Sequence, residues 1–440
     1  MAPQMTMKKR TSISTRAYSR SKMLRPELLV VGGGPKALAL AAKCEILREL
    51  GKADIGITII ERREVGANWC GDHGYTNGLQ HLGTPPEKDL GFPYNSVFGP
   101  DVDAMMLRYS WHAFRVYQRR YGEWIDRGKR HPVHKEWAHY LNWVLSLLKC
   151  IPVIGEVQNV RYSKGMIEAR YATQLGKLRH CKADGIVFTG PGEPQKVRGS
   201  QHTWTENITN GKNFWQRLDV FAGLGSGNVA VIGGGETAAS ILLALLAKAP
   251  NLNIDLINRH GTIFTRGESY HENLMYTDSG VWKELSAVDR SEFIRRTDRG
   301  VFSVESKKTI DHAERVRFVS GDVRNLVEIG RFVQVHMERD GKAVDKLYDK
   351  VVVALGFDAF APLTMLSRAL APELDRQEII EGVDEYLRVP IANNPTSGYY
   401  YYNIHMPMLA AMAQGPGFPN LSCLGTFADR VLQRYTSFAE

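Results

Sequence analysis

The chain has few cysteines and no long apolar run. Its 440 residues include five cysteines, which are scattered and form no Cys-x-x-Cys motif. A disulfide reductase needs a redox cysteine pair and most zinc sites need clustered ligands, so the sequence argues against both and favours a reducing compartment. The longest apolar run, Ile241 to Ala247, is too short to cross a bilayer. We therefore expect a soluble, cytoplasmic protein without a membrane span or a metal site.

Acidic residues are absent from residues 1–24, which are rich in Lys, Arg, Ser and Thr. This composition predicts a disordered basic extension, and a transit peptide of similar composition is the alternative. Much of the formal charge of +9 lies in this segment and not in the remainder. A mildly basic remainder suits a protein that binds anionic cofactors, so we expect no nucleic-acid partner.

Two glycine-rich turns of similar sequence each follow an apolar strand and open an Ala- and Leu-rich helix. The first turn consists of Gly32, Gly33, Gly34, Pro35 and Lys36, and the second of Gly233, Gly234, Gly235, Glu236 and Thr237. Glycine allows the tight turn and lets the backbone approach a pyrophosphate. Two such turns predict two Rossmann-like dinucleotide-binding domains, a pattern typical of a flavin enzyme that is reduced by a nicotinamide.

The residue that ends the second strand of each domain indicates which dinucleotide is bound. Glu61 ends the strand predicted for residues 56–61 and is a candidate to accept the ribose hydroxyls of FAD, although a surface carboxylate is the alternative. The corresponding strand of the other domain ends in Asn258-Arg259. An arginine there can pair with a 2′-phosphate, which favours NADPH over NADH. Arg266 competes with Arg259 for this role, and a solvated strand-end charge is the remaining alternative.

Two further strands indicate how the domains are connected. Strands at residues 185–188 and 350–353 both end in a glycine turn and lie on either side of the second dinucleotide turn. We predict an α/β fold in which an NADPH domain, residues 213–352, is inserted into an FAD domain formed by residues 25–212 and 353–440. The inserted domain includes a small helical substrate-binding region at about 270–310. The aromatic residues between 100 and 150 have a helical period and are expected to lie mostly in the core.

Several segments resemble one group of flavin enzymes. They are Gly66–Trp69, Leu82–Leu90, His271–Tyr276, Arg296–Ser303 and the segment Gln414–Leu424. Together with the second glycine turn they resemble the flavin-dependent N-hydroxylating monooxygenases, above all the lysine N6-monooxygenases of mycobactin- and nocobactin-type siderophore biosynthesis. The linker before the second turn lacks the F-x-G-x-x-x-H signature of Baeyer–Villiger and flavin-containing monooxygenases.

This resemblance implies a reaction. NADPH would reduce FAD, and a C4a-hydroperoxyflavin formed with O2 would transfer oxygen to the side-chain amine of L-lysine, supplying a hydroxamate precursor. Because the flavin carries the chemistry, no side chain is expected to be a catalytic nucleophile. An L-ornithine N5-monooxygenase, or a largely uncoupled NADPH oxidase that releases hydrogen peroxide, is the alternative. The relatives also suggest a homo-oligomer, either a dimer or a tetramer.

The resemblance also implies site residues beyond the two turns. Those expected at FAD are Asn68, Trp69, Leu82, Gly83, Gly417 and Phe418, and those expected at the substrate are Lys88, Asn273, Asn420 and Ser422. Lys88 would bind the α-carboxylate, unless it is a surface charge paired with Glu87 or Asp89.

The sequence departs from the ornithine enzymes at three points. Gly83 stands where they usually have Gln, Arg299–Phe302 where they have an Asn-Thr-Asn-Tyr run, and the serine of their closing segment is lost or replaced by Ser422. The lysine enzymes share these differences, which favours lysine as the substrate.

Overall fold

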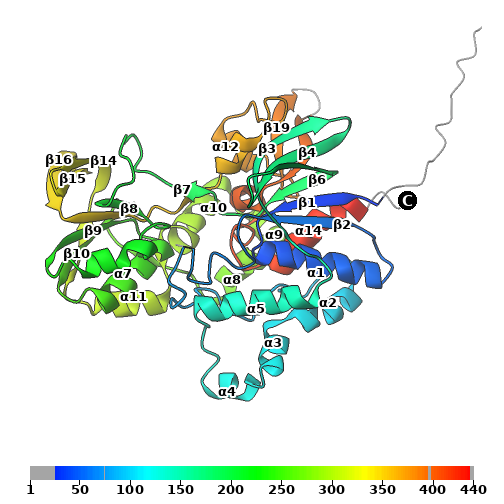
Figure 1. Cartoon of the computed structure of the whole chain (residues 1–440), viewed down its shortest axis with the longest axis horizontal. Coiled ribbons are helices and arrows are strands. Elements are labelled where there is room, and N and C mark those ends of the chain that lie inside the picture. The colour runs from blue at the N-terminus through cyan, green and yellow to red at the C-terminus, as the bar shows by residue number, and fades with distance from the viewer. Residues whose placement is uncertain (1–24, 74, 395–397, 437–440) are drawn as a thin grey trace, which may run out of the picture.

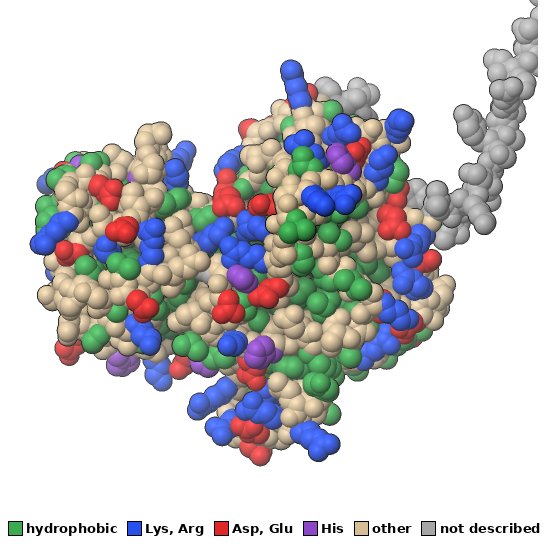
Figure 2. All heavy atoms as spheres, in the orientation of Figure 1, with side chains coloured by type: hydrophobic (Ala, Val, Ile, Leu, Met, Phe, Trp, Pro, Cys, Tyr) green, Lys and Arg blue, Asp and Glu red, His purple; other side chains and the backbone are tan. Residues whose placement is uncertain are grey.

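Two sheets with parallel strands at their centres form the two lobes of the molecule, which we describe from a computed structural model (Figure 1). The structure describes residues 25–73, 75–394 and 398–436, so the extension expected at residues 1–24 lies outside the described residues. None of the helices in these ranges combines the length and the apolar composition that a membrane span requires. Figure 2 shows basic and acidic side chains interspersed over both lobes on the face turned to the viewer.

The first sheet has eight strands in the order β19-β20-β6-β1-β2-β3-β4-β5. Its strands are β1 (Glu27–Val31), β2 (Gly56–Glu61), β3 (Val153–Ser163), β4 (Met166–Thr173), β5 (Leu178–Ala183), β6 (Gly185–Phe188), β19 (Arg388–Asn394) and β20 (Gly398–His405). The pairs from β20 to β3 are parallel, whereas β4, β5 and β19 join antiparallel at the edges. Leu28, Leu29 and Val30 of β1 are fully buried because helices cover the centre of the sheet.

The second sheet has five parallel strands in the order β13-β10-β9-β17-β8. These are β8 (Ile208–Asn210), β9 (Gly227–Ile232), β10 (Leu252–Asn258), β13 (Val316–Ser320) and β17 (Lys350–Val353). A separate antiparallel sheet of β14 (Asp322–Ile329), β15 (Phe332–Arg339) and β16 (Lys342–Tyr348) packs beside it. Both glycine turns thus lie in Rossmann-like sheets, one inserted into the other, which confirms the predicted fold class.

The chain crosses between the lobes earlier than residue 213. The crossing strands β7 (Glu193–Pro194) and β18 (Phe357–Asp358) pair antiparallel, and β8 already belongs to the second sheet. The sequence placed this boundary too late because a three-residue edge strand reading Ile-Thr-Asn has no periodic apolar pattern.

Helices cover the sheets and fill the space between the lobes. On the first lobe, α1 (Pro35–Glu49) packs against α14 (Leu424–Thr436), and a buried ion pair joins Lys43 to Asp429. On the second, α7 (Glu236–Lys248) packs against α11 (Val304–Asp311). The helices α8 (Tyr270–Thr277), α9 (Ser279–Glu284) and α10 (Ala287–Phe293), with the π-helical turn η3 (Ile294–Asp298), lie between the lobes (Figure 1). This is the helical region predicted at about 270–310.

The aromatic segment between residues 100 and 150 forms α2 (Pro100–Met106), η1 (Leu107–Tyr109), α3 (Trp111–Tyr117), α4 (Tyr121–Asp126) and α5 (His134–Leu147). Trp111, Trp137 and Tyr140 are fully buried and in mutual ring contact, whereas Tyr117 is exposed. The expectation that most of these aromatics belong to the core is confirmed.

The remaining short elements are η2 (Trp215–Arg217), α6 (Leu218–Ala222), β11 (Phe264–Thr265), β12 (Val301–Phe302), η4 (Ala361–Met365), α12 (Arg376–Glu381), η5 (Pro407–Leu409) and α13 (Ala411–Gln414).

Candidate functional site

The first glycine turn brings the end of β1 against Glu61. Gly32 has a φ of +107°, and a Cβ there would lie 2.4 Å from Thr189 Oγ1. The Gly33 N–H donates to Glu61 Oε2 at 2.5 Å, and the Arg63 N–H donates to Oε1 at 2.9 Å. The carboxylate that the sequence assigned to the ribose hydroxyls therefore lies at the turn and not on an unrelated surface.

The start of α1 suits a pyrophosphate. Gly34 is the N-cap and has no side-chain cap, Pro35 is at the first helical position, and no acidic residue lies in the first turn. A Cβ on Gly34 would meet only the ring of Trp69, at 3.9 Å. The Gly66 N–H donates to the Gly33 carbonyl at 3.2 Å, which ties the segment that contains Asn68 and Trp69 to this turn. An uncapped N-terminus with a glycine face is the arrangement that binds phosphate groups, so these residues fit the FAD pyrophosphate.

Lys36 joins α1 to the closing segment Gln414–Leu424. Its Nζ donates to the carbonyl oxygens of Pro419 and Asn420 at 3.1 and 3.2 Å. Burial lowers the pKa of Lys36 to about 8. Phe418 and Leu82 are buried, and Gly417 packs directly on Tyr276 of α8. The residues expected around FAD thus come from five separate parts of the chain.

The second glycine turn has the same form. Gly233 has a φ of +138°, and a Cβ there would lie 2.3 Å from the carbonyl oxygen of Ala354. A Cβ on Gly234 would lie 2.6 Å from Nδ2 of Asn258 at the end of β10. Arg259, the next residue, is exposed, and no carboxylate of the described residues lies within ion-pair distance of it. It is therefore free to receive a 2′-phosphate.

Glu236 and Arg266 face the first lobe. The Glu236 carboxylate accepts the Ser303 N–H and lies 3.8 Å from the Cβ position of Gly83, and burial raises its pKa. Arg266, which competed with Arg259 for the 2′-phosphate, donates from Nη2 to Ser422 Oγ at 3.1 Å and lies over the ring of Tyr276. Both side chains therefore belong to the contact between the lobes.

Lys88 and Asn273 meet between the two lobes although they are 185 residues apart. Lys88 Nζ donates to Asn273 Oδ1 at 2.5 Å. Burial, followed by the positive charge of Arg266, lowers the pKa of Lys88 to about 8. Asp89 is fully buried and accepts hydrogen bonds from Tyr94 Oη, Gly91 N and Trp111 N, so it does not neutralise Lys88. The alternative, in which Lys88 is a surface charge paired with Glu87 or Asp89, does not describe this arrangement.

Asn420 and Ser422 form a turn between two charged groups. The Ser422 N–H donates to Asn420 Oδ1 at 2.8 Å, and Asn420 Nδ2 donates to Asp298 Oδ1 at 3.2 Å. Asp298 was not among the predicted site residues. The available signal was its place in the Arg296–Ser303 segment, directly before the residues Arg299–Phe302 that differ from the ornithine enzymes.

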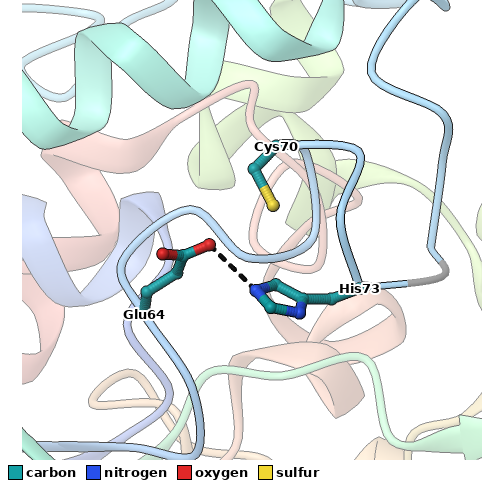
Figure 3. Close-up of side chains that lie close together, drawn as sticks. All are labelled: Glu64, Cys70 and His73. Carbon is teal, nitrogen blue, oxygen red and sulfur yellow. Dashed lines mark hydrogen bonds and ion pairs between the residues drawn. The ribbon is translucent and has the colours of Figure 1, made fainter.

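Glu64, Cys70 and His73 also come together, in the segment next to Trp69 (Figure 3). His73 Nε2 lies 2.9 Å from Glu64 Oε1, and the possible ligand atoms of the three side chains lie within 4.8 Å of one another. Cys70 Sγ already donates to the Ala67 carbonyl and accepts the Asp72 N–H. The folding of this segment on itself accounts for the cluster, and we assign no metal to it.

Comparison with known proteins agrees with this geometry. Residues 105–359 match the family described as L-lysine 6-monooxygenase/L-ornithine 5-monooxygenase. The L-lysine N6-monooxygenase MbtG of Mycobacterium sp. (strain MCS) is 36% identical over 419 residues, which cover 92% of this chain and 94% of that protein. MbtG of Mycobacterium tuberculosis H37Rv is 35% identical over 422 residues, 93% of this chain and 95% of that protein.

Solved structures show the same fold. The lysine monooxygenase NbtG from Nocardia farcinica superposes with a TM-score of 0.78 at 35% identity, covering 92% of this chain and 99% of that chain. The Kutzneria sp. 744 ornithine N-hydroxylase KtzI, with reduced FAD, NADP+ and L-ornithine, superposes with a TM-score of 0.76 at 20% identity, covering 95% and 100% of the two chains. The chain therefore belongs to the L-lysine 6-monooxygenase/L-ornithine 5-monooxygenase family.

Proposed function

We propose that this protein is an FAD- and NADPH-dependent monooxygenase that hydroxylates N6 of L-lysine for siderophore biosynthesis. The observation that carries the proposal is the half-buried Lys88–Asn273 pair between two dinucleotide-binding turns. Relatives of 34–36% identity named L-lysine N6-monooxygenase support lysine over ornithine. We further propose that it works in the cytoplasm, as a homo-oligomer, with O2 as the oxygen source.

The residues of the two turns would hold the cofactors. Glu61 would bind the ribose of FAD and the N-terminus of α1 its pyrophosphate, while the second turn and Arg259 would bind NADPH. When bound, the reduced flavin supplies the electrons and activates the oxygen. The protein must bring the flavin, the nicotinamide and the amine together and exclude water from the space between them.

Lys88 would bind the α-carboxylate, and Asn273 would hold the Lys88 ammonium in place without adding charge. The hydrogen bond to Asn273 fixes the direction of the ammonium, and the absence of a carboxylate partner among the described residues leaves its charge for the substrate. The amine must react as the neutral base although its solution pKa is ~10.4. The site must therefore remove a proton from it.

Product analysis tests this proposal. The purified protein should be yellow, and with NADPH and air it should convert L-lysine to N6-hydroxylysine, with one hydroxylamine formed per NADPH consumed. L-Ornithine and cadaverine are the matched comparison substrates. Faster hydroxylation of ornithine would contradict the lysine assignment. If one hydrogen peroxide is formed for each NADPH consumed and no hydroxylamine is found, the protein is an NADPH oxidase instead.

Replacing Arg259 with alanine is expected to raise the KM for NADPH by about 10- to 100-fold, because a charge-assisted contact to the 2′-phosphate is lost. The KM for NADH, which lacks that phosphate, should stay the same. Steady-state NADPH and NADH oxidation at saturating lysine measures both constants. Equal increases for the two nucleotides would show that Arg259 does not recognise the phosphate.

The affinity for L-lysine is expected to fall as the pH rises through about 8, where Lys88 loses its charge. The sign follows from the lowered pKa: the ammonium binds the carboxylate below this pH, and the neutral amine does not bind it above this pH. Lys88→Arg stays charged over the whole range, so its KM should not rise between pH 7 and 9. The KM for lysine at each pH, compared between the two proteins, measures the effect. Parallel curves of KM against pH for the two proteins would exclude Lys88 as the source of the pH dependence.

A further inference from the structure

The carboxylate of Asp298 is buried and only partly satisfied by the protein. Asp298 ends the π-helical turn η3, and its side chain is 3% exposed. Its Oδ1 accepts the amide of Asn420 at 3.2 Å, whereas the buried Oδ2 has no hydrogen-bond donor among the described residues. A buried carboxylate oxygen without a donor is costly unless a ligand supplies one, and π-helical turns occur frequently at functional sites.

The charged and titratable groups nearby leave Oδ2 without a hydrogen-bond donor, although one of them is within ion-pair distance. Arg299 Nε forms an ion pair with Oδ2 at 3.2 Å but donates no hydrogen bond to it, and the Arg299 side chain is 53% exposed. Tyr276 Oη donates to a backbone carbonyl of the π-turn at 3.0 Å. Lys36 Nζ donates to two carbonyl oxygens of the closing segment. The hydrogen-bonding position at Oδ2 therefore remains open.

The turn formed by Asn420 and Ser422 contacts Asp298 at one end and faces two cations, Arg266 and Lys88, at the other. Asn420 contacts Asp298, and Ser422, two residues later, accepts from Arg266. Arg266 is close enough to Lys88 to lower its pKa, and neither cation has a carboxylate partner within ion-pair distance among the described residues. The ends of this turn thus match the charges of an amino acid with a terminal ammonium.

From this arrangement we propose that Asp298 binds the side-chain ammonium of the amino-acid substrate and accepts the proton that it must lose. The N–H bond breaks, the proton moves to Oδ2, and the electron pair stays on nitrogen, which can then attack oxygen. The overall reaction of the ammonium form with NADPH and O2 gives the hydroxylamine, NADP+ and water and needs no additional proton. The inference rests on the proposed function and adds to it the residue that recognises the amine.

Equilibrium binding tests the recognition step without turnover. L-Lysine and 6-hydroxynorleucine, which carries a neutral hydroxyl in place of the ammonium, are titrated into the oxidised flavoprotein at pH 7 by calorimetry. The wild type should prefer lysine by about 10- to 100-fold, the contribution of a charge-assisted hydrogen bond. Asp298→Asn keeps the shape and the contact to Asn420 and should bind both ligands equally. Asp298→Glu should restore part of the preference, and the exposed Asp311→Asn should behave as wild type.

The pH dependence of turnover tests the proton transfer. Asp298→Asn must take up the small fraction of neutral lysine from solution, so its kcat/KM should rise about tenfold per pH unit between about pH 6 and 7.5, below the pH at which Lys88 loses its charge and well below the amine pKa of ~10.4. The wild type should rise less steeply. An unchanged preference for lysine over 6-hydroxynorleucine in Asp298→Asn would overturn the inference, as would a change confined to the KM for NADPH. Failure of the wild type to hydroxylate any amine would instead reject the proposed function.

Discussion

Replacing Lys88 with methionine should raise the KM for L-lysine by about 10- to 150-fold, since a charge-assisted hydrogen bond to the carboxylate contributes roughly 1.5–3 kcal/mol. Methionine has a similar length and lacks the charge, and it leaves Asn273 Oδ1 without the donor that it has at 2.5 Å. The flavin content and the KM for NADPH should stay near those of the wild type, because Lys88 belongs to neither glycine turn. Steady-state hydroxylamine formation at varied lysine concentration measures the effect.

The control for this variant is Lys177→Met, which removes an exposed lysine from the turn before β5. It should not change the KM for lysine. An increase in the KM for NADPH in Lys88→Met, with that for lysine unchanged, would place Lys88 at the nicotinamide and contradict the carboxylate assignment.

Replacing Gly32 with alanine should abolish most FAD binding, so that the purified protein contains less than about a tenth of the wild-type flavin. Two effects add: the φ of +107° is unfavourable for any residue with a Cβ, and that Cβ would lie 2.4 Å from Thr189 Oγ1. The turn must therefore move, which displaces the Gly33 N–H from Glu61. The flavin absorbance per protein after gel filtration measures the loss.

Gly51→Ala is the matched control. Gly51 also has a positive φ, +66°, but a Cβ there would meet nothing within 4 Å. This variant should lose about 1 kcal/mol of stability from backbone strain and keep its flavin. Equal flavin loss in both variants would mean that backbone strain, and not the geometry of the dinucleotide turn, causes the effect. Normal flavin in Gly32→Ala would contradict the assignment of this turn to FAD.

The sequence predicted the fold class because the relevant signals are local. Each glycine turn is a continuous strand-turn-helix segment in which backbone conformation restricts the residue, as the φ values of Gly32 and Gly233 show. The predicted limits of β2, residues 56–61, agree with the structure. The short edge strand β8 was missed because three residues carry no periodicity and the pairing with β17 depends on the rest of the sheet.

The site was predicted less completely. The resemblance suggested Lys88, Asn273, Asn420 and Ser422, and the structure brings these residues into two hydrogen-bonded groups. For Arg266 the sequence predicted only a contact with the 2′-phosphate, and for Asp298 it predicted no role. The reason is that the linear sequence does not show which residues contact a charged side chain between two helices. Their contacts with Ser422 and Asn420 join residues 156 and 122 positions apart.

The sequence by itself determined that two dinucleotides bind, because a glycine turn, the helix after it and the strand-end Glu61 or Arg259 lie within a single βαβ unit. The tertiary structure decided which residues meet at the proposed substrate site. Lys88 with Asn273, and Asp298 with Asn420, come from opposite lobes or from segments far apart in the chain. The hydrogen bonds and the burial that define these pairs exist only after the helices between the lobes have packed against the closing segment.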